Sequence, residues 1–257
     1  MHKTARQSAI LNEVTARGSC EVADLAHRLG VSGETIRRDI KRLASDGRLR
    51  KVHGGATLPG VLHEADFLQR MDENAAAKQA IARAAAAHVS DGDTLAFDTG
   101  TTTAYVARAL VDRRNLLIVT NSLDIAGTLA GSRARGTNRV YMAGGELQVE
   151  LGAALGSTAV EFVEQFRVRT AFLSAGAIDA TEGLMDYDLA EALFSRALIG
   201  CAERVIVVAD HTKFGQRGLV RACDLEAIDM LVTDAAPPPA LAERLDAAGV
   251  VVEVAAS

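Results

Sequence analysis

The stretch VSGETIRRDIKRLASDGRLRKVHGGA, residues 31–56, decides how the first part of this chain folds. Ile36, Ile40 and Leu43 recur at spacings of four and three, so they share one face of a helix. The basic side chains between them point elsewhere. Ser32 is suited to cap the start of this helix, and Gly47 is suited to end it. The pattern therefore predicts an amphipathic and strongly basic helix.

The segments on either side of this helix extend the prediction. Residues 48–53 alternate loosely between basic and apolar side chains before the turn at Gly54, as in a short β-wing. Apolar residues share one face of residues 21–29, which end at Gly30, and a further helical pattern covers residues 5–17. A basic helix alone is often a solvated surface helix, but the helix, turn and wing occur together here. We predict a winged helix-turn-helix domain over residues 1–57.

Charge is divided unequally along the chain. Residues 1–58 contain 11 Lys and Arg against 6 Asp and Glu, whereas the remainder contains 17 against 27. A basic head on an acidic body indicates a nucleic-acid-binding module joined to a module that does not bind nucleic acid.

Length and composition limit the possible classes of protein. A chain of 257 residues is expected to form about two domains, and 49% hydrophobic residues with only 4% aromatics predict cores of Ala, Val, Leu and Ile. Cys20, Cys201 and Cys223 are too widely spaced for a zinc or redox motif, so we expect reduced thiols, no metal and no cofactor. Because no apolar run is long enough to cross a membrane, we expect a soluble, cytoplasmic protein.

The rest of the chain divides into a linker and a second domain. Residues 58–75 are the candidate linker, with Pro59, Gly60 and a possible helix near residues 64–71. Over residues 76–257, short apolar strands alternate with helices. This alternation predicts an α/β domain with a largely parallel sheet.

Small polar residues follow several of the predicted strands, and ligands bind beyond the carboxyl ends of strands in such sheets. One polar segment lies between a strand at 94–97 and a helix at 104–110. Backbone N–H groups and Thr hydroxyls at a helix N-terminus suit a phosphate, although the segment is not a Walker A loop. The alternative is ordinary helix capping. The predicted binding residues in this segment are Asp98, Thr99, Gly100, Thr101, Thr102 and Thr103.

Weaker signals follow other strands. Each of these segments is also compatible with an ordinary turn or, for Lys213, with a solvated surface side chain. The further candidates for effector binding are Asn121, Ser122, Gly144, Asp179 and Lys213. In residues 183–191, GLMDYDLAE, the acidic side chains either select a polyol or sugar or begin a helix, and both interpretations remain open.

The run SGETIRRDIKRLASDGRLRKVHGGA resembles the DNA-binding signature of the DeoR family of bacterial transcriptional regulators. DTGTTT, TNS, AGG, SAGAID and ADHTKFG, taken in order, are similar to the pattern of that family's effector domain. The resemblance implies that residues 76–257 share the fold of ribose 5-phosphate isomerase and sense a phosphorylated sugar or related metabolite.

The hypothesis that follows is a regulator, expected to be a repressor, of sugar or polyol metabolism genes. It binds a double-stranded DNA operator through base and phosphate contacts, as a homo-oligomer because paired reading heads increase specificity. The predicted DNA-binding residues are Ser32, Thr35, Arg37, Arg38, Lys41, Arg42, Arg48, Arg50, Lys51 and His53.

Two other classes of function compete with this hypothesis. A sugar phosphate isomerase with an added DNA-binding head would use Asp179, Glu191 and Lys213 in acid-base chemistry, and would turn over aldose and ketose phosphates. A structural DNA-binding protein without an effector would bind DNA with weak sequence preference and would not respond to any ligand.

Overall fold

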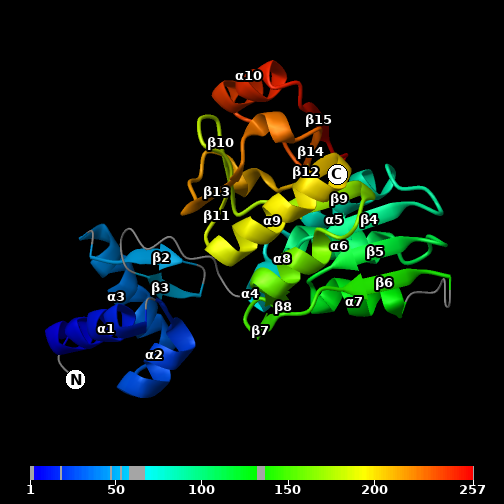
Figure 1. The fold of residues 1–257 in the computed structure, drawn as a ribbon. Helices are drawn as coiled ribbons and strands as arrows, with labels where there is room; N and C mark the ends of the chain where they lie inside the picture. The colour runs from blue at the N-terminus through cyan, green and yellow to red at the C-terminus, as the bar shows by residue number, and fades with distance from the viewer. Residues whose placement is uncertain are drawn as a thin grey trace. The chain divides into compact units, whose positions relative to one another are not determined.

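A computed structural model of the chain describes residues 3–17, 19–46, 48–52, 54–57, 67–131 and 137–256. The chain forms two compact units, residues 1–65 and residues 66–257, and each is considered by itself. The first is a helical unit with a small antiparallel sheet, and the second is built on a parallel sheet (Figure 1). The predicted fold class, a winged helix-turn-helix followed by an α/β domain, is confirmed.

Three helices form the smaller unit: α1 (Lys3–Arg17), α2 (Val22–Leu29) and α3 (Gly33–Ser45). Ile36, Ile40 and Leu43 are all buried in one core, as their spacing predicts. Gly30 ends α2 in the left-handed conformation, with φ of 63°, which explains why glycine suits the turn before α3. The side chain of Ser32 caps α3 by accepting a hydrogen bond from the Thr35 backbone N–H at 3.3 Å.

The wing contains one more strand than we predicted. β2 (Arg50–Val52) and β3 (Gly55–Thr57) pair antiparallel, and β3 also pairs with β1 (Ser19–Glu21). A β-carbon on Gly55 would lie 2.3 Å from the carbonyl oxygen of Cys20, so only glycine allows this close strand pairing.

The sheet of the larger unit has seven strands, and every pair of neighbours is parallel. Its order is β15-β14-β12-β9-β4-β5-β6. In chain order the strands are β4 (Thr94–Phe97), β5 (Leu117–Thr120), β6 (Arg139–Met142), β9 (Val168–Ser174), β12 (Ala202–Val208), β14 (Met230–Thr233) and β15 (Val251–Val254).

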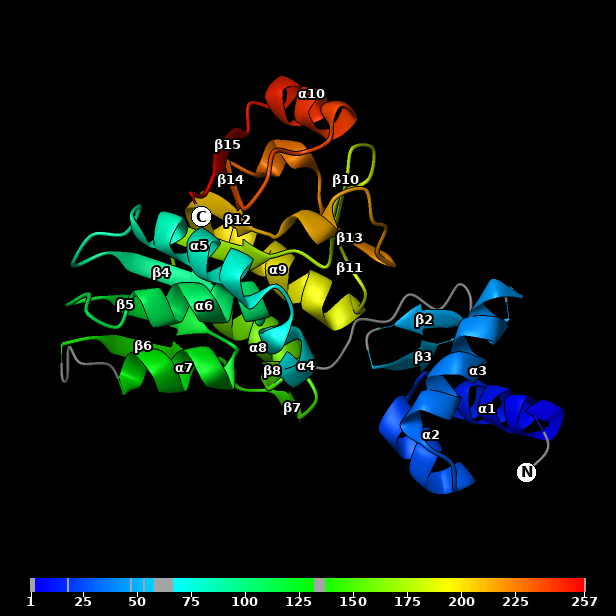
Figure 2. The ribbon, with the colours of Figure 1, turned by 180° about the vertical axis from the view of Figure 1, so that it is seen from behind.

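Helices cover both faces of this sheet (Figures 1 and 2). Side chains of alternate strand residues enter opposite cores: Leu95 and Phe97 pack on one face, and Ala96 packs on the other. The face with Leu95 is covered by α5 (Ala75–Ala86), α6 (Thr101–Ala109) and α7 (Leu123–Ala130). The opposite face is covered by α8 (Ser157–Val163), α9 (Leu189–Cys201) and α10 (Pro239–Ala247).

Several short elements decorate the larger unit. β7 (Glu146–Gln148) and β8 (Ala153–Leu155) form a hairpin, and β10 (Ala177–Asp179), β11 (Gly183–Asp186) and β13 (Val220–Cys223) form a small antiparallel sheet. Two single-turn helices, η1 (His211–Lys213) and η2 (Leu225–Ala227), follow β12 and β13. Among the described residues, no helix has both the length and the apolar character that a membrane crossing requires.

The predicted linker over residues 58–75 is too long. Helix α4 (Phe67–Asp72) lies within that range, and its Phe67 and Met71 are buried in the same core as α5 and α6. Residues 67–75 therefore belong to the larger unit, because their apolar side chains complete its core. Residues 58–66 lie outside the described residues.

Candidate functional site

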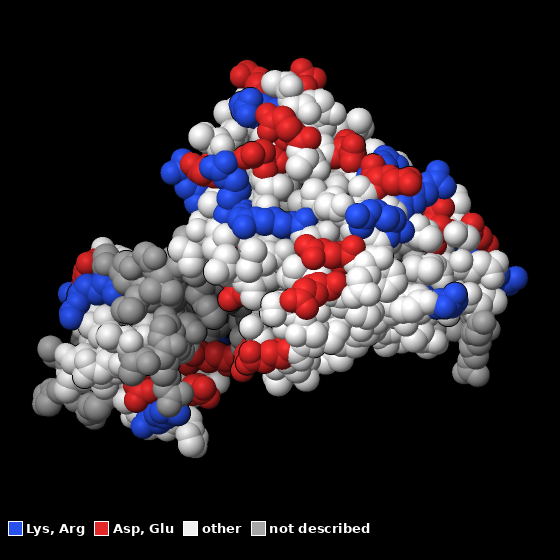
Figure 3. All heavy atoms as spheres, in the orientation of Figure 1, with Lys and Arg blue, Asp and Glu red and all other residues white. Residues whose placement is uncertain are grey.

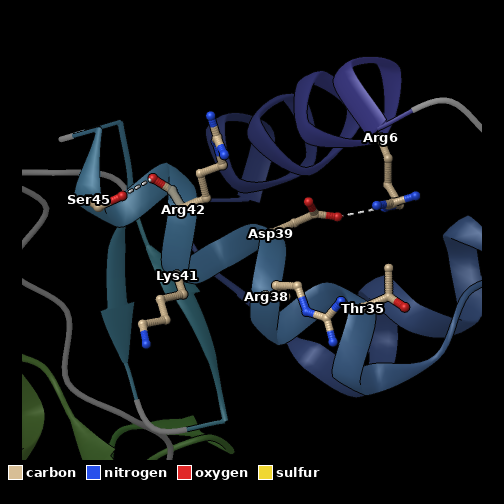
Figure 4. A pocket seen from close by; sticks show the side chains of 7 residues that line it. All are labelled: Arg6, Thr35, Arg38, Asp39, Lys41, Arg42 and Ser45. Atoms are coloured by element: carbon tan, nitrogen blue, oxygen red, sulfur yellow. Dashed lines mark hydrogen bonds and ion pairs between the residues drawn. The ribbon is translucent and has the colours of Figure 1, made fainter.

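The first candidate site is the basic surface of α3. Arg38, Lys41 and Arg42 are exposed and line a groove of about 480 Å³ (Figure 4). Thr35, Asp39 and Ser45 of the same helix and Arg6 of α1 complete the lining. Arg6 is paired with Asp39, so Arg38, Lys41 and Arg42 supply the net positive charge that attracts a phosphate backbone.

Of the four basic residues that we predicted on α3 to bind DNA, Arg37 is the one that does not line the groove. Its guanidinium forms an exposed ion pair with Glu34 at 3.5 Å, one turn earlier on the helix. Such exposed pairs contribute little to stability, so Arg37 remains available to another partner.

A buried ion pair joins α1 to α3. Arg6 Nε donates to Asp39 Oδ2 at 2.6 Å (Figure 4). Gln7 Nε2 donates to Asp39 Oδ1 at 3.0 Å. Asp39 is only 3% exposed, so both carboxylate oxygens are satisfied inside the protein. Because Asp39 follows Arg38 directly, this contact fixes the orientation of the basic face. Arg6 is absent from our sequence-based list, because it lies 33 residues before its partner.

The predicted wing residues are only partly described. Arg48 is exposed, and Arg50 and Lys51 lie on β2. His53 lies outside the described residues.

The second candidate site lies at the carboxyl ends of β4, β5 and β9, and Asp98 is at its centre. The Ser174 backbone N–H and hydroxyl donate to Asp98 Oδ2 at 2.7 and 2.9 Å, and the Thr103 hydroxyl donates to Oδ1 at 2.9 Å. Burial raises the pKa of Asp98 from 3.8 to about 6, while these hydrogen bonds and the charge of Arg70 act in the opposite direction. Asp98 thus joins the ends of two neighbouring strands to α6.

Helix α6 begins three residues earlier than we predicted. Its N-cap is Gly100, so Thr101, Thr102 and Thr103 form its first turn, and all three are buried. A β-carbon on Gly100 would lie 2.0 Å from Ser174 Oγ, which explains the glycine between the strand and the helix. The free N–H groups of this first turn remain a suitable place for an anion.

Asn121 and Ser122 have different roles at the end of β5. Ser122 is the N-cap of α7 and accepts from the Ile125 backbone N–H at 3.4 Å, which is the capping alternative. Asn121 is completely buried, and its Nδ2 donates to the Ala154 carbonyl at 3.1 Å. Its Oδ1 has no hydrogen-bond partner in the part of the chain that the structure describes. Such an orphan acceptor in a polar site indicates that a water or ligand group satisfies it.

A small cavity lies against these residues. Its volume is about 10 Å³, which is room for about one water molecule. The lining consists of Asp98, Thr99, Asn121, Asp186, Glu191, Phe194 and Ser195. In the segment 183–191, which we left open, Asp188 caps α9 by accepting from two backbone N–H groups, whereas Asp186 and Glu191 line the cavity. Asp188 therefore begins the helix, and the polyol or sugar interpretation stays a prediction for Asp186 and Glu191.

Two buried cations near this site, Arg70 and Lys78, are absent from our sequence-based list, and Arg70 acts electrostatically on Asp98. Lys78 of α5 is 3% exposed, and its Nζ donates to the carbonyl oxygen of Arg70 on α4. Burial lowers the pKa of Lys78 from 10.5 to about 8; Asp210 opposes this shift, while Lys213 and Arg70 add to it. The predicted effector residue Lys213 thus belongs to a cation cluster with Arg70 and Lys78. The carboxylates of Asp210 and Glu73 also act on Lys78, so the three cations are only partly balanced and a bound anion would offset the remaining positive charge.

Asp179 and Gly144 are among the predicted effector residues that do not line the cavity. Asp179 accepts from the backbone N–H groups of Thr181 and Glu182 and pairs with Arg217 at 3.5 Å, and these contacts lower its pKa. This is the role of a turn residue between β10 and β11. Gly144 follows β6, and a β-carbon added to it would meet no atom within 4 Å.

The charge distribution on the surface separates the two units. On the face of the larger unit seen in Figure 3, Lys and Arg side chains are interspersed with Asp and Glu. A DNA-binding surface requires a continuous basic patch, which this face does not offer. Among the described residues, Arg38, Lys41 and Arg42 gather around one groove on α3.

The chain belongs to the class of helix-turn-helix transcriptional regulators. A family model of the DeoR-like helix-turn-helix domain matches residues 6–60, and one of the DeoR C-terminal sensor domain matches residues 73–235. The second match alone covers more than half of the chain, so the protein is a member of the DeoR family. It is therefore a transcriptional regulator with a sensor domain, not an isomerase.

Relatives of similar length support this assignment. The glycerol-3-phosphate regulon repressor of Escherichia coli K12 is 35% identical over 245 residues, which cover 95% of this chain and 96% of the relative. The repressor CsqR of the same organism is 35% identical, with 93% and 91% covered. The repressor AccR of Agrobacterium fabrum is 36% identical, with 89% and 88% covered.

Among solved structures, ribose 5-phosphate isomerase A from Neisseria gonorrhoeae aligns with a TM-score of 0.39 and 15% identity, covering 55% of this chain and 53% of the isomerase. Eukaryotic initiation factor eIF2B beta from Chaetomium thermophilum aligns with a TM-score of 0.43 and 14% identity, covering 71% and 55%.

Proposed function

We propose that this protein is a repressor of sugar or polyol metabolism genes whose DNA affinity changes when a phosphorylated sugar or polyol binds the larger unit. The observation that carries the effector proposal is the cluster of Arg70, Lys78 and Lys213, of which Arg70 also acts electrostatically on Asp98. The cluster, the N–H groups at the start of α6 and the orphan acceptor of Asn121 lie at one edge of the sheet. The names of the relatives agree, since one of them is a glycerol-3-phosphate regulon repressor.

The DNA-binding part of the proposal rests on α3. Arg38, Lys41 and Arg42 would contact base edges and phosphates of a double-stranded operator, and Arg37 and the wing residues Arg48, Arg50, Lys51 and His53 would contact its backbone or minor groove. Ser32 and Thr35 mark the start of α3, where recognition helices approach bases. The protein would act in the cytoplasm as a homo-oligomer, because paired heads read paired half-sites.

The proposal is tested by fluorescence anisotropy of the full chain on DNA from its own upstream region, at fixed salt, with scrambled DNA as the control. We expect specific DNA binding, and we expect one member of a panel of phosphorylated sugars and polyols to change the DNA affinity. Equal binding to scrambled DNA would refute operator reading. If DNA binding is specific but no compound in the panel changes its affinity, the effector proposal is refuted. Sedimentation velocity tests the proposed homo-oligomer. A monomer that binds DNA with full affinity would contradict that proposal.

Variants of α3 test the placement of the reading face. Arg38→Ala is expected to cost about 1–3 kcal/mol of operator affinity and to relax specificity, whereas Lys41→Ala should weaken all sequences alike and reduce the salt slope by about 1. Arg28→Ala is the matched control in the same unit, because Arg28 lies on α2 and pairs with Glu13 of α1. If Arg38→Ala binds the operator as tightly as Arg28→Ala does, the reading face is misplaced.

A further inference from the structure

The cavity at the ends of β4 and β5 has a chemical character of its own. With about 10 Å³, it has room for a single hydroxyl-sized group rather than for a whole sugar phosphate. Phe194 supplies an apolar wall, and nearly all the other lining side chains carry oxygen acceptors. The cavity is therefore a subsite for one polar group of a larger ligand.

The orientation of the Asn121 amide is fixed by its surroundings. The Ala154 carbonyl can only accept a hydrogen bond, so the amide nitrogen must face it, as the distance of 3.1 Å shows. Oδ1 is consequently an acceptor, and it has no partner among the described residues although Asn121 is fully buried. A group that donates a hydrogen bond to Oδ1 would remove the cost of this buried orphan.

Carboxylates supply most of the remaining lining. Asp186 ends β11, and Glu191 lies in the first turn of α9, which Asp188 caps. Asp98 is already engaged by Ser174 and Thr103, so it contributes negative charge more than free acceptor capacity. Thr99 and Ser195 are the lining residues with hydroxyl groups, and the Thr99 hydroxyl donates to the Leu151 carbonyl at 3.3 Å.

We propose that this cavity receives a hydroxyl group of the effector and excludes a carboxylate at the same position. A hydroxyl can donate to Asn121 Oδ1, whereas a carboxylate can only accept and would meet the negatively charged side chains of the lining. The inference rests on the proposed function, in which the cation cluster of Lys78 holds the phosphate of the same ligand. The effector class is then a phosphorylated polyol or sugar, and phosphorylated sugar acids are rejected.

Matched pairs of ligands test this inference by isothermal titration calorimetry on the full chain. Glucitol 6-phosphate and 6-phosphogluconate differ only at the terminal carbon, and glycerol 3-phosphate and 3-phosphoglycerate form the equivalent shorter pair. We expect the polyol member of at least one pair to bind at least about a hundredfold more tightly than its acid and more tightly than inorganic phosphate. Equal or tighter binding of the acids would overturn the inference, and so would binding of every compound no tighter than inorganic phosphate.

Inorganic phosphate separates the failure of this inference from that of the proposed function. If neither it nor any of the phosphorylated compounds binds, the anion site itself is wrong. Lys78→Met should abolish inorganic phosphate binding while the tyrosine fluorescence of the larger unit stays native.

Glu191→Gln then tests the hydroxyl subsite alone, because the amide keeps the size of the side chain and adds a donor. We expect acid binding to strengthen at least tenfold relative to polyol binding, with the affinity for inorganic phosphate unchanged. Asp186→Asn is the second variant if Glu191→Gln does not fold. An unchanged ratio of acid to polyol affinity in a folded variant would overturn the assignment.

Discussion

Replacing Asp98 with Asn should make the larger unit more stable at neutral pH than the natural protein. Burial raises the pKa of Asp98 to about 6 from 3.8, so the folded state binds a proton that the unfolded state has released between these pH values. Stability from this group is therefore greatest at low pH and falls as pH rises from about 4 through 6. The difference between the two pKa values corresponds to about 3 kcal/mol of lost stability above pH 6.

Asn keeps the hydrogen bonds of Asp98 without its charge. Its oxygen can accept from the Ser174 N–H, and its nitrogen can donate to Thr103, whose hydroxyl still reaches the Gly100 carbonyl at 2.9 Å. The stability difference between Asp98→Asn and the natural protein should thus grow by up to about 3 kcal/mol between pH 4 and pH 7. Other titrating groups cancel in this difference.

Urea unfolding followed by tyrosine fluorescence measures this effect. The chain contains no Trp, and its three Tyr residues, Tyr105, Tyr141 and Tyr187, all lie in the larger unit, so the signal reports that unit alone. Asp246→Asn, at an exposed position of α10, is the matched control. A difference for Asp98→Asn that stays within about 0.5 kcal/mol across this pH range would refute the reasoning.

Three further predictions use the same protein. Gly100→Ala should destabilise the larger unit by about 1–3 kcal/mol, because the new β-carbon would lie 2.0 Å from Ser174 Oγ. Gly144→Ala is the control and should change stability little, because its β-carbon would meet no atom within 4 Å. Equal effects of the two substitutions in tyrosine-monitored unfolding would contradict this prediction. Sulfate, whose charge does not change above neutral pH, should bind less tightly in calorimetry as pH rises through about 8, because Lys78 then loses its proton; a constant affinity would argue against Lys78 as a ligand. Asp39→Ala should lower the free energy of unfolding of the smaller unit by about 3–5 kcal/mol, since it removes the buried carboxylate that pairs with Arg6. Glu34→Ala, which removes only an exposed ion pair, should have no measurable effect. Unfolding followed by the helical circular dichroism signal compares the two variants.

Local sequence patterns were sufficient for the elements with a strong period. Ile36, Ile40 and Leu43 predicted the buried face of α3, and Ser32 predicted its cap, because both features are set within a few residues of chain. The parallel sheet followed from the alternation of apolar strands with helices. The three-residue strands β1 and β7 were missed, because so short a segment shows no period.

The missed site residues were those whose role depends on tertiary packing. Lys78 stands in an Ala-rich helix, where a lysine is ordinarily solvated, and its burial comes from the packing of α4 beside α5. Arg70 lay within the predicted linker. The pairing of Asp39 with Arg6 of α1 was not predicted, since no local pattern joins residues 33 positions apart.

The β7–β8 hairpin gives the strand-end site a physical connection to the start of the larger unit. Its Ala154 carbonyl holds Asn121, its connecting turn holds Thr99 through Leu151, and the Glu150 carbonyl accepts from the Phe67 backbone N–H at 3.3 Å. Phe67 begins α4, which follows the segment that joins the two units in sequence. A ligand changes DNA affinity only through states that it binds unequally. This hairpin is hydrogen-bonded both to Asn121 and to the first residue of α4, the helix nearest in sequence to the DNA-binding unit, so a ligand could change DNA affinity through it only by binding two arrangements of these contacts unequally.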